Sequence, residues 1–460
     1  MKYNCFLCML CAGLILVACE KKPDMTVSPA NIIIDAFPEE AATFDISTDV
    51  EWTVTVTQTE EWLTVSPLKG KGNTTINVEA DEYYELTEPR SALIIITGNG
   101  VKTDTVRVSQ MPDVDVKDQI EDEIFREYCL ARFDTNHDGI LSMKEAREAV
   151  EINVGRMKIK SLAGIEFFIN IIRLNCRDNE IEYLDVNNNK KIRELNCYNN
   201  SIKSLNLSNN SELRKIDCCY NQIKEIDVSG LANLTELYLH SAELTSIDVS
   251  NNTKLDWLAI SNNRIANLDV SNNKELQGLE CNDNGLTTLN VSSNTKLWSL
   301  YCSNNKLTAL NLNSNTMLLH LMCNYNQITD INLNNNTVLQ SLMCANNKFS
   351  NLNLSMCANL TKLICNTNQL SSLNLNNNTE LKELQCDANL LSTLNLSNNT
   401  KLENFSGTNN KFQEMNIAVN NRLNRIDLRN NPNLAKIFVW QGFFEIDDYK
   451  KDKDASWVKP

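Results

Sequence analysis

The 460-residue sequence lacks most features on which catalysis, nucleic-acid binding and membrane insertion depend. It contains only three histidines, and it has no nucleophile–histidine–acid set, phosphate-binding loop or HExxH motif. A formal net charge of -15 weighs against nucleic acid and anionic lipid as partners. After the first residues, no apolar run approaches the roughly 18 residues of a membrane-spanning helix. We therefore expect a binding or structural protein and no enzyme.

The sequence does contain a repeat with a period of 21 residues, which covers more than half of the chain. The residues that open successive units are Leu174, Leu195, Ile216, Leu237, Leu258, Leu279, Leu300, Leu321, Leu342, Leu363, Leu384, Phe405 and Ile426. With the last leucine of the preceding unit, a typical unit reads L-x-x-L-x-C-x-x-N-x-L. This motif resembles the leucine-rich-repeat family. The resemblance implies that residues 174–437 form a leucine-rich-repeat solenoid with a parallel concave β-sheet.

A single unit is too small to bury its own apolar side chains, so we expect each leucine position to form a column through the stack. Positions 1 and 3 should point inward from a short strand, and positions 2, 4 and 21 outward. Two columns of asparagine should support the turns, because an amide side chain both donates and accepts hydrogen bonds. The first is Asn179, Asn200, Asn221, Asn263, Asn284, Asn305, Asn326, Asn347, Asn368, Asn389, Asn410 and Asn431; the second includes Asn189, Asn210, Asn252, Asn273, Asn294, Asn315, Asn336, Asn378, Asn399 and Asn420.

Nine cysteines share position 3 of the unit, where other units carry Leu or Ile. They are Cys176, Cys197, Cys218, Cys281, Cys302, Cys323, Cys344, Cys365 and Cys386. A position that accepts Cys, Leu and Ile is an apolar core position. Stacked thiols would lie about 5 Å apart, within disulfide reach, but their parallel Cβ directions oppose the required dihedral angle. We favour structural thiols, with disulfides and a metal site as the alternatives.

The chain begins with a basic residue and a short apolar run that ends in Leu-Val-Ala-Cys19. This start resembles the signal peptide and lipobox of a bacterial lipoprotein, and the run is too short for a spanning helix. The resemblance implies a signal peptide over 1–18, lipidation of Cys19 and a tether over 19–24. It also implies an outer-membrane lipoprotein, which we place at the cell surface. An ordinary secretory signal is the alternative.

Residues 25–112 contain short β-branched runs between Gly, Pro and Asn turns, which is typical of an Ig-like β-sandwich. The segment resembles BACON, the Bacteroidetes-associated carbohydrate-binding, often N-terminal domain, through Trp52, Trp62, Gly70-Lys-Gly72, Arg90 and Val108-Ser-Gln110. The resemblance implies glycan binding. Both tryptophans lie in alternating apolar runs, however, and we interpret them as core residues. We therefore favour a spacer role over glycan binding.

Residues 134–145 match the spacing of an EF-hand calcium loop. The predicted ligands are Asp134, Asn136, Asp138, Ile140 through its carbonyl, Ser142 through water, and Glu145 through both carboxylate oxygens. Oxygen ligands in this number favour Ca²⁺ over Mg²⁺. Ile120, Ile124, Phe125, Tyr128 and Phe133 should give the entering helix an apolar face. Only one loop is present, so we expect a structural ion bound at about 10⁻⁴–10⁻³ M; a degenerate loop without metal is the alternative.

The segment from Ile159 to Phe168 looks like the entry of an internalin-type solenoid, in which an EF-hand-like helical cap seals the first repeat. Such a cap is needed because a terminal repeat must cover its open edge. We therefore assign residues 117–173 to a calcium-binding N-terminal cap. We assign 438–460 to a C-terminal cap and tail, in which 438–444 closes the stack and 450–454 are solvated.

The outward positions of the predicted strands indicate where a ligand would bind. At position 2, polar residues give way to four consecutive apolar ones, and three aromatic residues lie near them in register. The predicted partner-binding residues are Trp257, Trp298, Tyr301, His320, Met322, Met343 and Ile364. Contiguous exposed apolar residues, especially aromatics and Met, mark protein-binding sites. Ordinary packing between repeats, or a contact with the sandwich, is the alternative explanation.

Together these features predict a monomeric, adhesin-like surface protein that binds a protein partner through the concave face of its repeats. Glycan capture is the second hypothesis. It would use the sandwich or the tyrosines near the strand ends, which are Tyr198, Tyr220 and Tyr325. A purely structural role is the third.

Overall fold

The computed structural model of the chain describes residues 23–460 except 39, 59 and 60. The predicted signal peptide and Cys19 lie outside the described residues. The chain divides into two compact units, with the division between Asp115 and Val116. In the part that the structure describes, none of the helices combines the length and the hydropathy that a bilayer crossing requires.

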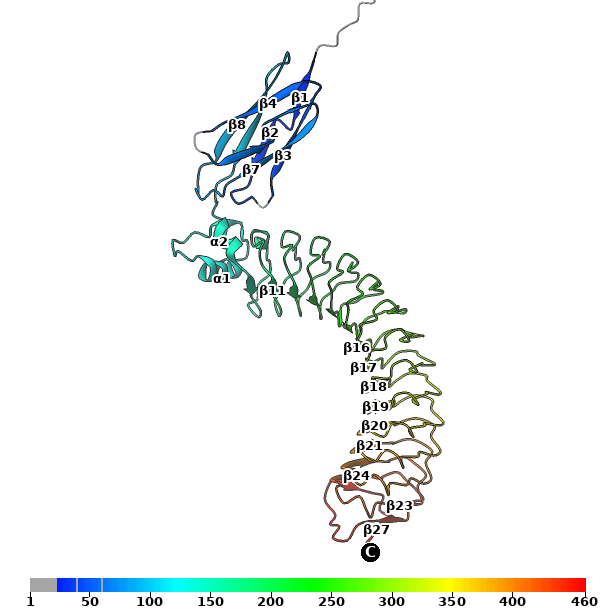
Figure 1. The fold of residues 1–460 in the computed structure, drawn as a ribbon. Helices are drawn as coiled ribbons and strands as arrows, with labels where there is room; N and C mark the ends of the chain where they lie inside the picture. The colour runs from blue at the N-terminus through cyan, green and yellow to red at the C-terminus, as the bar shows by residue number, and fades with distance from the viewer. Residues whose placement is uncertain (1–22, 39, 59–60) are drawn as a thin grey trace, which may run out of the picture. The chain divides into compact units, whose positions relative to one another are not determined.

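The first unit is a β-sandwich of two sheets (Figure 1). Its strands are β1 (Met25–Ser28), β2 (Asn31–Ile34), β3 (Ala42–Thr48), β4 (Glu51–Thr57), β5 (Leu63–Ser66), β6 (Lys69–Lys71), β7 (Thr74–Ala80), β8 (Arg90–Gly98) and β9 (Asp104–Gln110). The sheets have the orders β1-β3-β7-β5 and β2-β9-β8-β4-β6. Neighbouring strands are antiparallel except for the parallel pair β2 and β9. Their residues alternate between core and solvent, which agrees with the sandwich prediction.

The core of the sandwich contains both tryptophans, as predicted. Trp52 and Trp62 are 2% and 4% exposed, among apolar residues of both sheets. The guanidinium of Arg90 lies 4.5 Å from the ring centroid of Trp62 and 4.4 Å from that of Tyr83, in cation–π geometry. Gln110 is fully buried and donates to three backbone carbonyls. The residues that resemble the BACON domain therefore stabilise the sandwich itself.

The second unit begins with short helices that precede the first repeat. They are η1 (Lys117–Gln119), α1 (Glu123–Phe133), α2 (Met143–Glu148) and η2 (Ile165–Phe167). Asp122 caps α1 by accepting hydrogen bonds from two backbone N–H groups. Ser142 and Glu145 form a capping box at the start of α2. Both helix starts therefore follow from their sequences.

Apolar packing joins these helices to the solenoid. The rings of Phe125 and Phe133 lie 6.3 and 5.3 Å, centroid to centroid, from the ring of Phe168. The prediction for Ile124 is wrong: it is exposed, and Cys129 is the third buried residue of α1. Position 129 follows Phe125 by four residues, so it lies on the same side of the helix.

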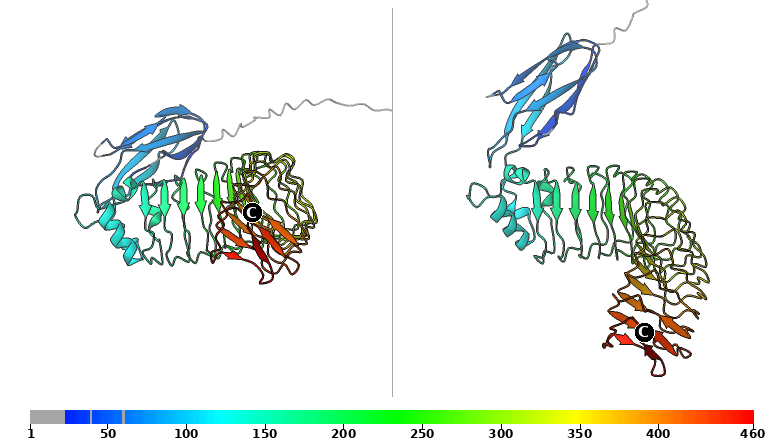
Figure 2. Two further views of the ribbon diagram at one scale, coloured as in Figure 1. Left: turned by 90° about the horizontal axis from the view of Figure 1, so that it is seen from below. Right: turned by 60° about the horizontal axis from the view of Figure 1, so that its bottom comes forward.

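The repeats form one parallel sheet along the concave side of a curved stack (Figures 1 and 2). The strands of the thirteen repeats are β11 (Arg173–Asn175), β12 (Glu194–Asn196), β13 (Lys215–Asp217), β14 (Glu236–Tyr238), β15 (Trp257–Ala259), β16 (Gly278–Glu280), β17 (Ser299–Tyr301), β18 (His320–Met322), β19 (Ser341–Met343), β20 (Lys362–Ile364), β21 (Glu383–Gln385), β22 (Asn404–Ser406) and β24 (Arg425–Asp427). Each pairs with the next at a spacing of 21 residues, so equivalent positions form columns.

The sheet is longer than predicted by one strand at each end. The strand β10 (Glu151–Asn153) precedes β11, and β26 (Tyr449–Lys450) follows β24, which gives 15 strands. A second parallel sheet contains β23 (Glu414–Asn416), β25 (Lys436–Phe438) and β27 (Ser456–Val458). The strands β10 and β26 are thus the edges of the longer sheet, and their shortness limits edge-to-edge association with other chains.

The C-terminal residues are therefore part of the fold. Most side chains of 450–454 are solvent-exposed, as predicted, but the segment is not a free tail. Asp452 accepts hydrogen bonds from the backbone N–H groups of Asn430 and Asn431. The rings of Trp440, Phe443, Tyr449 and Trp457 pack together, with centroids 4.9 to 6.4 Å apart in the closest pairs. The closure that we predicted for 438–444 thus extends to residue 458.

Inside the stack, each asparagine of the first column forms hydrogen bonds through both its amide nitrogen and its amide oxygen. Asn305 donates from Nδ2 to the carbonyls of Cys281 and Cys302, and its Oδ1 accepts from the N–H of Leu286. In the second column, only the amide nitrogen of each asparagine forms hydrogen bonds. Asn315 donates to two carbonyls, at 2.9 Å each, while its buried Oδ1 has no partner in the described chain.

The cysteine column is buried, as predicted, and all cysteines of the described chain are free thiols. Burial raises the pKa of Cys281 and Cys323 to about 12. These thiols are protonated at neutral pH, so they act as small apolar side chains rather than as nucleophiles or metal ligands.

Candidate functional site on the concave face

Four apolar side chains form an unbroken column on the concave face. Tyr301, Met322, Met343 and Ile364 are partners in register along β17 to β20, and we call them the apolar column. Each side chain points outward, as predicted, and is half-buried. Strands lie about 4.8 Å apart, so large side chains in one column cover part of one another. Lateral packing thus accounts for part of their burial, and the sheet face remains accessible.

Three aromatic side chains lie beside this column. The ring centroid of Trp298 is 5.6 Å from that of Trp257 and 6.1 Å from that of His320, and we call these residues the aromatic cluster. Trp257 lies against Gly278, its partner in register. A Cβ atom at Gly278 would come within 2.3 Å of the indole. The glycine therefore makes room for the ring, and this Trp–Gly pairing at a spacing of 21 was a signal that the sequence analysis missed.

Two polar atoms in this region are buried without a hydrogen-bond partner in the described chain. They are Nε1 of Trp257 and Oγ of Ser299. Ser299 is fully buried although it precedes the inward-facing Leu300, so its side chain belongs to the concave side of β17. An unsatisfied buried polar group costs about 1–3 kcal/mol. The concave face thus keeps two donors that its own fold leaves unused.

Toward the N-terminal repeats, the same face becomes charged. Glu236 lies 2.6 Å from Lys215 and accepts a hydrogen bond of 2.8 Å from the hydroxyl of Tyr238. Nε2 of His240 lies 3.4 Å from Glu280, and Nδ1 accepts from a backbone N–H. Burial, then the hydrogen bond to Glu236 and nearby carboxylates, raises the pKa of Tyr238.

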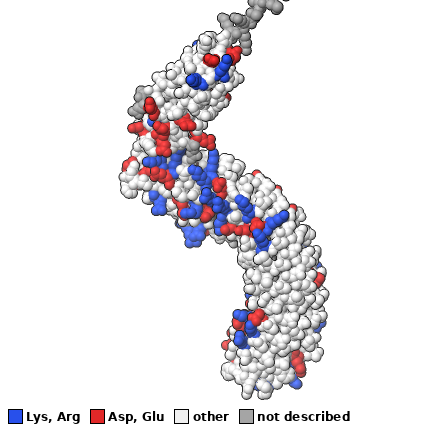
Figure 3. All heavy atoms as spheres, viewed as in Figure 1, with Lys and Arg blue, Asp and Glu red and all other residues white. Residues whose placement is uncertain are grey.

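Beyond the apolar column, charge returns with the ion pair of Lys362 and Glu383, 2.9 Å apart. In the view of Figure 3, Lys, Arg, Asp and Glu gather over the helices and the first repeats, and far fewer appear on the later repeats. The apolar column and the aromatic cluster therefore lie between two charged stretches of the concave face.

The predicted calcium ligands lie in the loop between α1 and α2. Asp134, Asn136 and Asp138 accept hydrogen bonds from backbone N–H groups of the loop. The carboxylate of Glu145 accepts from the N–H groups of Thr135 and Ser142. In the described residues, no three His, Cys, Asp or Glu side chains converge closely enough to hold a metal ion. The oxygen donors suit a hard cation, but Glu145 would have to exchange these contacts to bind one.

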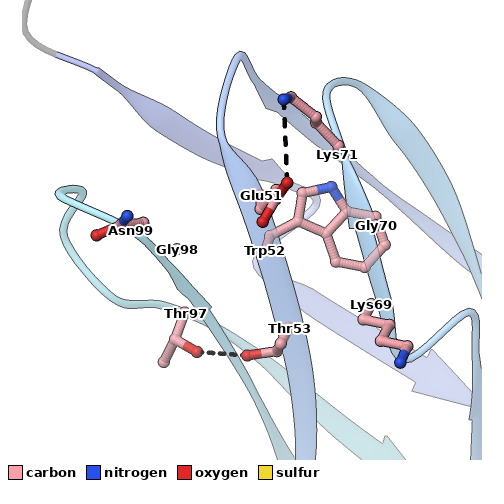
Figure 4. A pocket seen from close by; sticks show the side chains of 9 residues that line it. All are labelled: Glu51, Trp52, Thr53, Lys69, Gly70, Lys71, Thr97, Gly98 and Asn99. Atoms are coloured by element: carbon pink, nitrogen blue, oxygen red, sulfur yellow. Dashed lines mark hydrogen bonds and ion pairs between the residues drawn. The ribbon is translucent and has the colours of Figure 1, made fainter.

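The sandwich has an open groove of about 610 Å³ over β4, β6 and β8. Figure 4 shows its polar lining, with Lys71 toward Glu51, 3.9 Å apart, and Thr53 toward Thr97, 2.8 Å apart. Trp52 is covered by Gly70, where a Cβ atom would come within 2.3 Å of the indole. Trp52 is 2% exposed, so its ring face is not available to stack on a sugar in this groove.

Exposed tyrosines mark one edge of the concave sheet. Tyr220 and Tyr325 are 51% and 59% exposed, and the ring of Tyr198 lies 5.2 Å from that of Tyr220. Tyr220 and Tyr325 have φ angles of 55° and 53°, in the left-handed region that asparagine tolerates better. Asn occupies this position in several other repeats, so folding does not require tyrosine here.

Comparison with known proteins agrees with both parts of this fold. A family model described as BACON, "Putative binding domain, N-terminal", matches residues 46–111. The functional domain of InlJ from Listeria monocytogenes, whose description includes a cysteine ladder, is similar with a TM-score of 0.60 and 26% identity, over 70% of this chain and 80% of that chain.

Two further structures are similar in fold. The internalin InlF from Listeria monocytogenes has a TM-score of 0.55 and 24% identity, over 75% of this chain and 97% of that chain. A TDR receptor has a TM-score of 0.58 and 20% identity, over 65% and 61%. No curated protein matches the chain. The chain therefore combines a BACON domain with a leucine-rich-repeat solenoid of internalin-like fold.

Proposed function

We propose that this protein is a cell-surface lipoprotein that recognises a protein partner through the concave face of its repeats. The observation that carries the proposal is the apolar column beside the aromatic cluster. The fold does not require apolar residues in this column, because other repeats carry Asn175, Asn196 and Gln385 there. Aromatic residues and Met are enriched in protein-binding hot spots, and solenoids present extended concave binding surfaces.

A pull-down from host secretions and extracellular matrix tests the proposal. The bait is the full chain, beside a variant that carries Met322→Asp and Met343→Asp. Exposed Met317 and Met356 lie outside the strands, so Met317→Asp with Met356→Asp is a matched control. Two lost hot-spot contacts of about 2 kcal/mol each correspond to an affinity loss of several hundredfold or more.

We expect the native chain and the matched control to retain the same protein, and the concave variant to lose it with unchanged circular dichroism. Equal retention by the folded concave variant would contradict binding at this face.

The surface location depends on lipidation of Cys19. The proposal rests on the lipobox-like sequence before this residue, because Cys19 lies outside the described residues. Labelled palmitate should enter the native protein during expression in a bacterium, and it should not enter Cys19→Ala. Protease added to intact cells should then degrade the native protein, whereas protection from the protease would place it on the inner side of the membrane.

The loop between α1 and α2 would hold a structural calcium ion. Support comes from its six oxygen donors and from Gly139, whose φ of 78° allows the sharp turn. At a calcium concentration ten times the dissociation constant, binding stabilises the folded state by about 1.4 kcal/mol. We expect calcium to raise the melting temperature of the native chain and of His137→Asn, but not of Asp138→Ala. An unchanged melting temperature in millimolar calcium would contradict the structural ion.

Glycan binding is the second candidate function, favoured by the exposed tyrosines at the edge of the sheet. Tyr220 and Tyr325 adopt a costly backbone conformation that an asparagine at the same position would relieve. A tyrosine ring can stack on the face of a sugar, and neighbouring Asn304 and Asn346 offer amide groups for its hydroxyls. A glycan array probed with the native chain and with Tyr325→Asn tests this candidate. Identical signals from both proteins would place any glycan site elsewhere.

A further inference from the structure

The apolar column continues, in the same register, into an acidic stretch. Asp217, Tyr238, Ala259 and Glu280 are successive partners along β13 to β16, and Glu280 pairs with Tyr301 at the start of the apolar column. Consecutive strands are about 4.8 Å apart, so Glu280 and Met322 are separated by about 10 Å. One straight line on the sheet therefore carries carboxylates at one end and apolar side chains at the other.

Carboxylates outnumber cations in the acidic stretch. Asp217, Glu236, Asp256 and Glu280 lie on β13 to β16 or next to them, and the positively charged side chains beside them are Arg214 and Lys215, with His240 close to Glu280. Lys215 is paired with Glu236. In the described chain, Asp217 and Asp256 form no ion pair. This part of the face thus has a negative charge that its own side chains leave incompletely balanced.

Tyr238 shows how this stretch accommodates a cation. Nζ of Lys215 lies 5.3 Å from the ring centroid of Tyr238 and 2.6 Å from Glu236. An ammonium group is therefore stable here between an aromatic face and a carboxylate. Asp217 precedes this ring in the column. Glu280 lies two strands after it, where its register partner Tyr301 offers a second cation the same combination of groups.

Ser299 leaves a buried polar group unsatisfied where the acidic stretch meets the apolar column. Its strand, β17, joins the acidic stretch to the apolar column. The side chain is fully buried on the concave side, and its Oγ has no hydrogen-bond partner in the described chain. Native structures seldom leave such a group unsatisfied, because it forfeits a hydrogen bond. Because this Oγ is fully covered, a bound chain can reach it only when the side chains above it move.

We propose that the partner contributes an extended segment in which a Lys or Arg side chain contacts Glu280, attracted also by the charge of Asp217, while apolar side chains cover the apolar column. This inference rests on the proposed function and adds the chemistry of the ligand. An extended chain advances about 3.3 Å per residue, so the basic residue at Glu280 and the apolar residue that covers Met322 are about three positions apart. Charge complementarity sets the direction of the segment on the sheet and accelerates its association.

A phage library of random 12-residue peptides, selected on the full chain, tests the inference. The charge variant carries Asp217→Asn and Glu280→Gln, and the matched control carries Glu275→Gln and Glu380→Gln. The control residues are paired with Lys296 and Lys401 outside the strands. Losing a charge-assisted contact corresponds to an affinity loss of about tenfold or more. We expect enriched peptides to carry Lys or Arg about three positions from an apolar group.

The outcomes separate this inference from the proposed function. Peptides that bind the control normally, lose affinity for the charge variant and bind more weakly in 0.5 M NaCl would support the inference. Peptides that need Met322 and Met343 but carry no basic residue, and that bind the charge variant equally, would overturn the inference and leave the proposed function intact. Peptides that bind the Met322→Asp, Met343→Asp variant as tightly as the native chain would overturn both. Circular dichroism of each variant establishes that it is folded.

Discussion

The inner and outer columns of the solenoid share one backbone but have very different sequences. Inside, position 1 is Leu, Ile or Phe throughout, and position 3 is Cys in most repeats. On the concave side, position 2 changes from Asn175 to Tyr238, then to Met322 and to Gln385. The inner columns are uniform because every repeat must bury the same surface against its neighbours. The outer columns are free to vary, so their local pattern reports on what the face contacts.

The largest expected effect is a loss of stability at alkaline pH, caused by the buried thiols of the inner columns. Burial raises the pKa of Cys281, Cys323 and Cys365 to about 12, whereas an unfolded thiol has a pKa of about 8.5. Below about pH 8.5 both states are protonated, so stability is unaffected. As the pH rises toward 12, the unfolded state loses protons that the folded state keeps. Each such thiol then lowers the free energy of unfolding by about 1.4 kcal/mol per pH unit.

Denaturant unfolding of the reduced protein at pH 7, 9 and 10 measures this loss. Cys281→Ile is the control, because Ile260 occupies the same position in the preceding repeat. It should reduce the dependence on pH by the contribution of one thiol. Equal stability of the native chain at pH 7 and pH 10 would contradict the role assigned to the cysteine column.

The two asparagine columns should differ in a second test. Asn305→Ala removes donors to carbonyls of neighbouring repeats and also the acceptor of the Leu286 N–H, so we expect a loss of about 3 kcal/mol or more. Asn315→Ala removes donors only, because its Oδ1 is unpaired, and should cost less. In the same column, Cys357 makes only weak contacts through its thiol, at 3.8 and 4.0 Å. Chemical denaturation of the two variants should rank them in this order, and the reverse order would be inconsistent with the hydrogen bonds described.

Substitutions on the concave face should change the free energy of unfolding much less than substitutions in the inner columns. Met322 and Met343 are half-buried on the sheet surface, so we expect each change to Asp to alter the free energy of unfolding by about 1 kcal/mol or less. Calorimetry of the concave variant and of the matched Met317 and Met356 control should give similar melting temperatures. A much lower melting temperature in the concave variant alone would show that the apolar column stabilises the fold. The inner and outer columns would then not differ in the way described.

The smallest expected effect is a gain in stability rather than a loss. Tyr325→Asn relieves a tyrosine with a φ of 53°, and asparagine accepts this conformation more readily, so stability should rise by about 0.5–1 kcal/mol. Tyr183→Asn is a useful control, because Tyr183 is also exposed but does not have a positive φ. A loss of stability in Tyr325→Asn would mean that its ring makes contacts that outweigh the strain.

The period of 21 residues predicted the repeat strands, the buried thiols and the pairing of the first asparagine column. These features follow from one unit copied many times, so each repeat constrains the interpretation of the others. The strands β10, β26 and β27 were missed because their residues do not carry the repeat motif. They are strands because they pair with the ends of an existing sheet, which local sequence does not encode.

The concave face was predictable in outline only. The sequence placed Tyr301, Met322, Met343 and Ile364 in one outward column, which the register confirms. It left open how far packing between repeats buries these side chains, and it did not predict that Trp257 lies against Gly278. Both depend on how large side chains share the space between neighbouring strands, and the repeat motif specifies only the backbone and the core.

Site-specific photo-crosslinking tests the central claim most directly. A benzophenone amino acid would replace Met343 on the concave face or, in a second protein, the exposed Met356 outside the strands. Each full-length protein would be irradiated with the partner recovered by the native chain. We predict a covalent adduct with the partner from position 343 and none from position 356. Crosslinking from 356 with none from 343 would show that the partner binds elsewhere and would contradict recognition by the concave face.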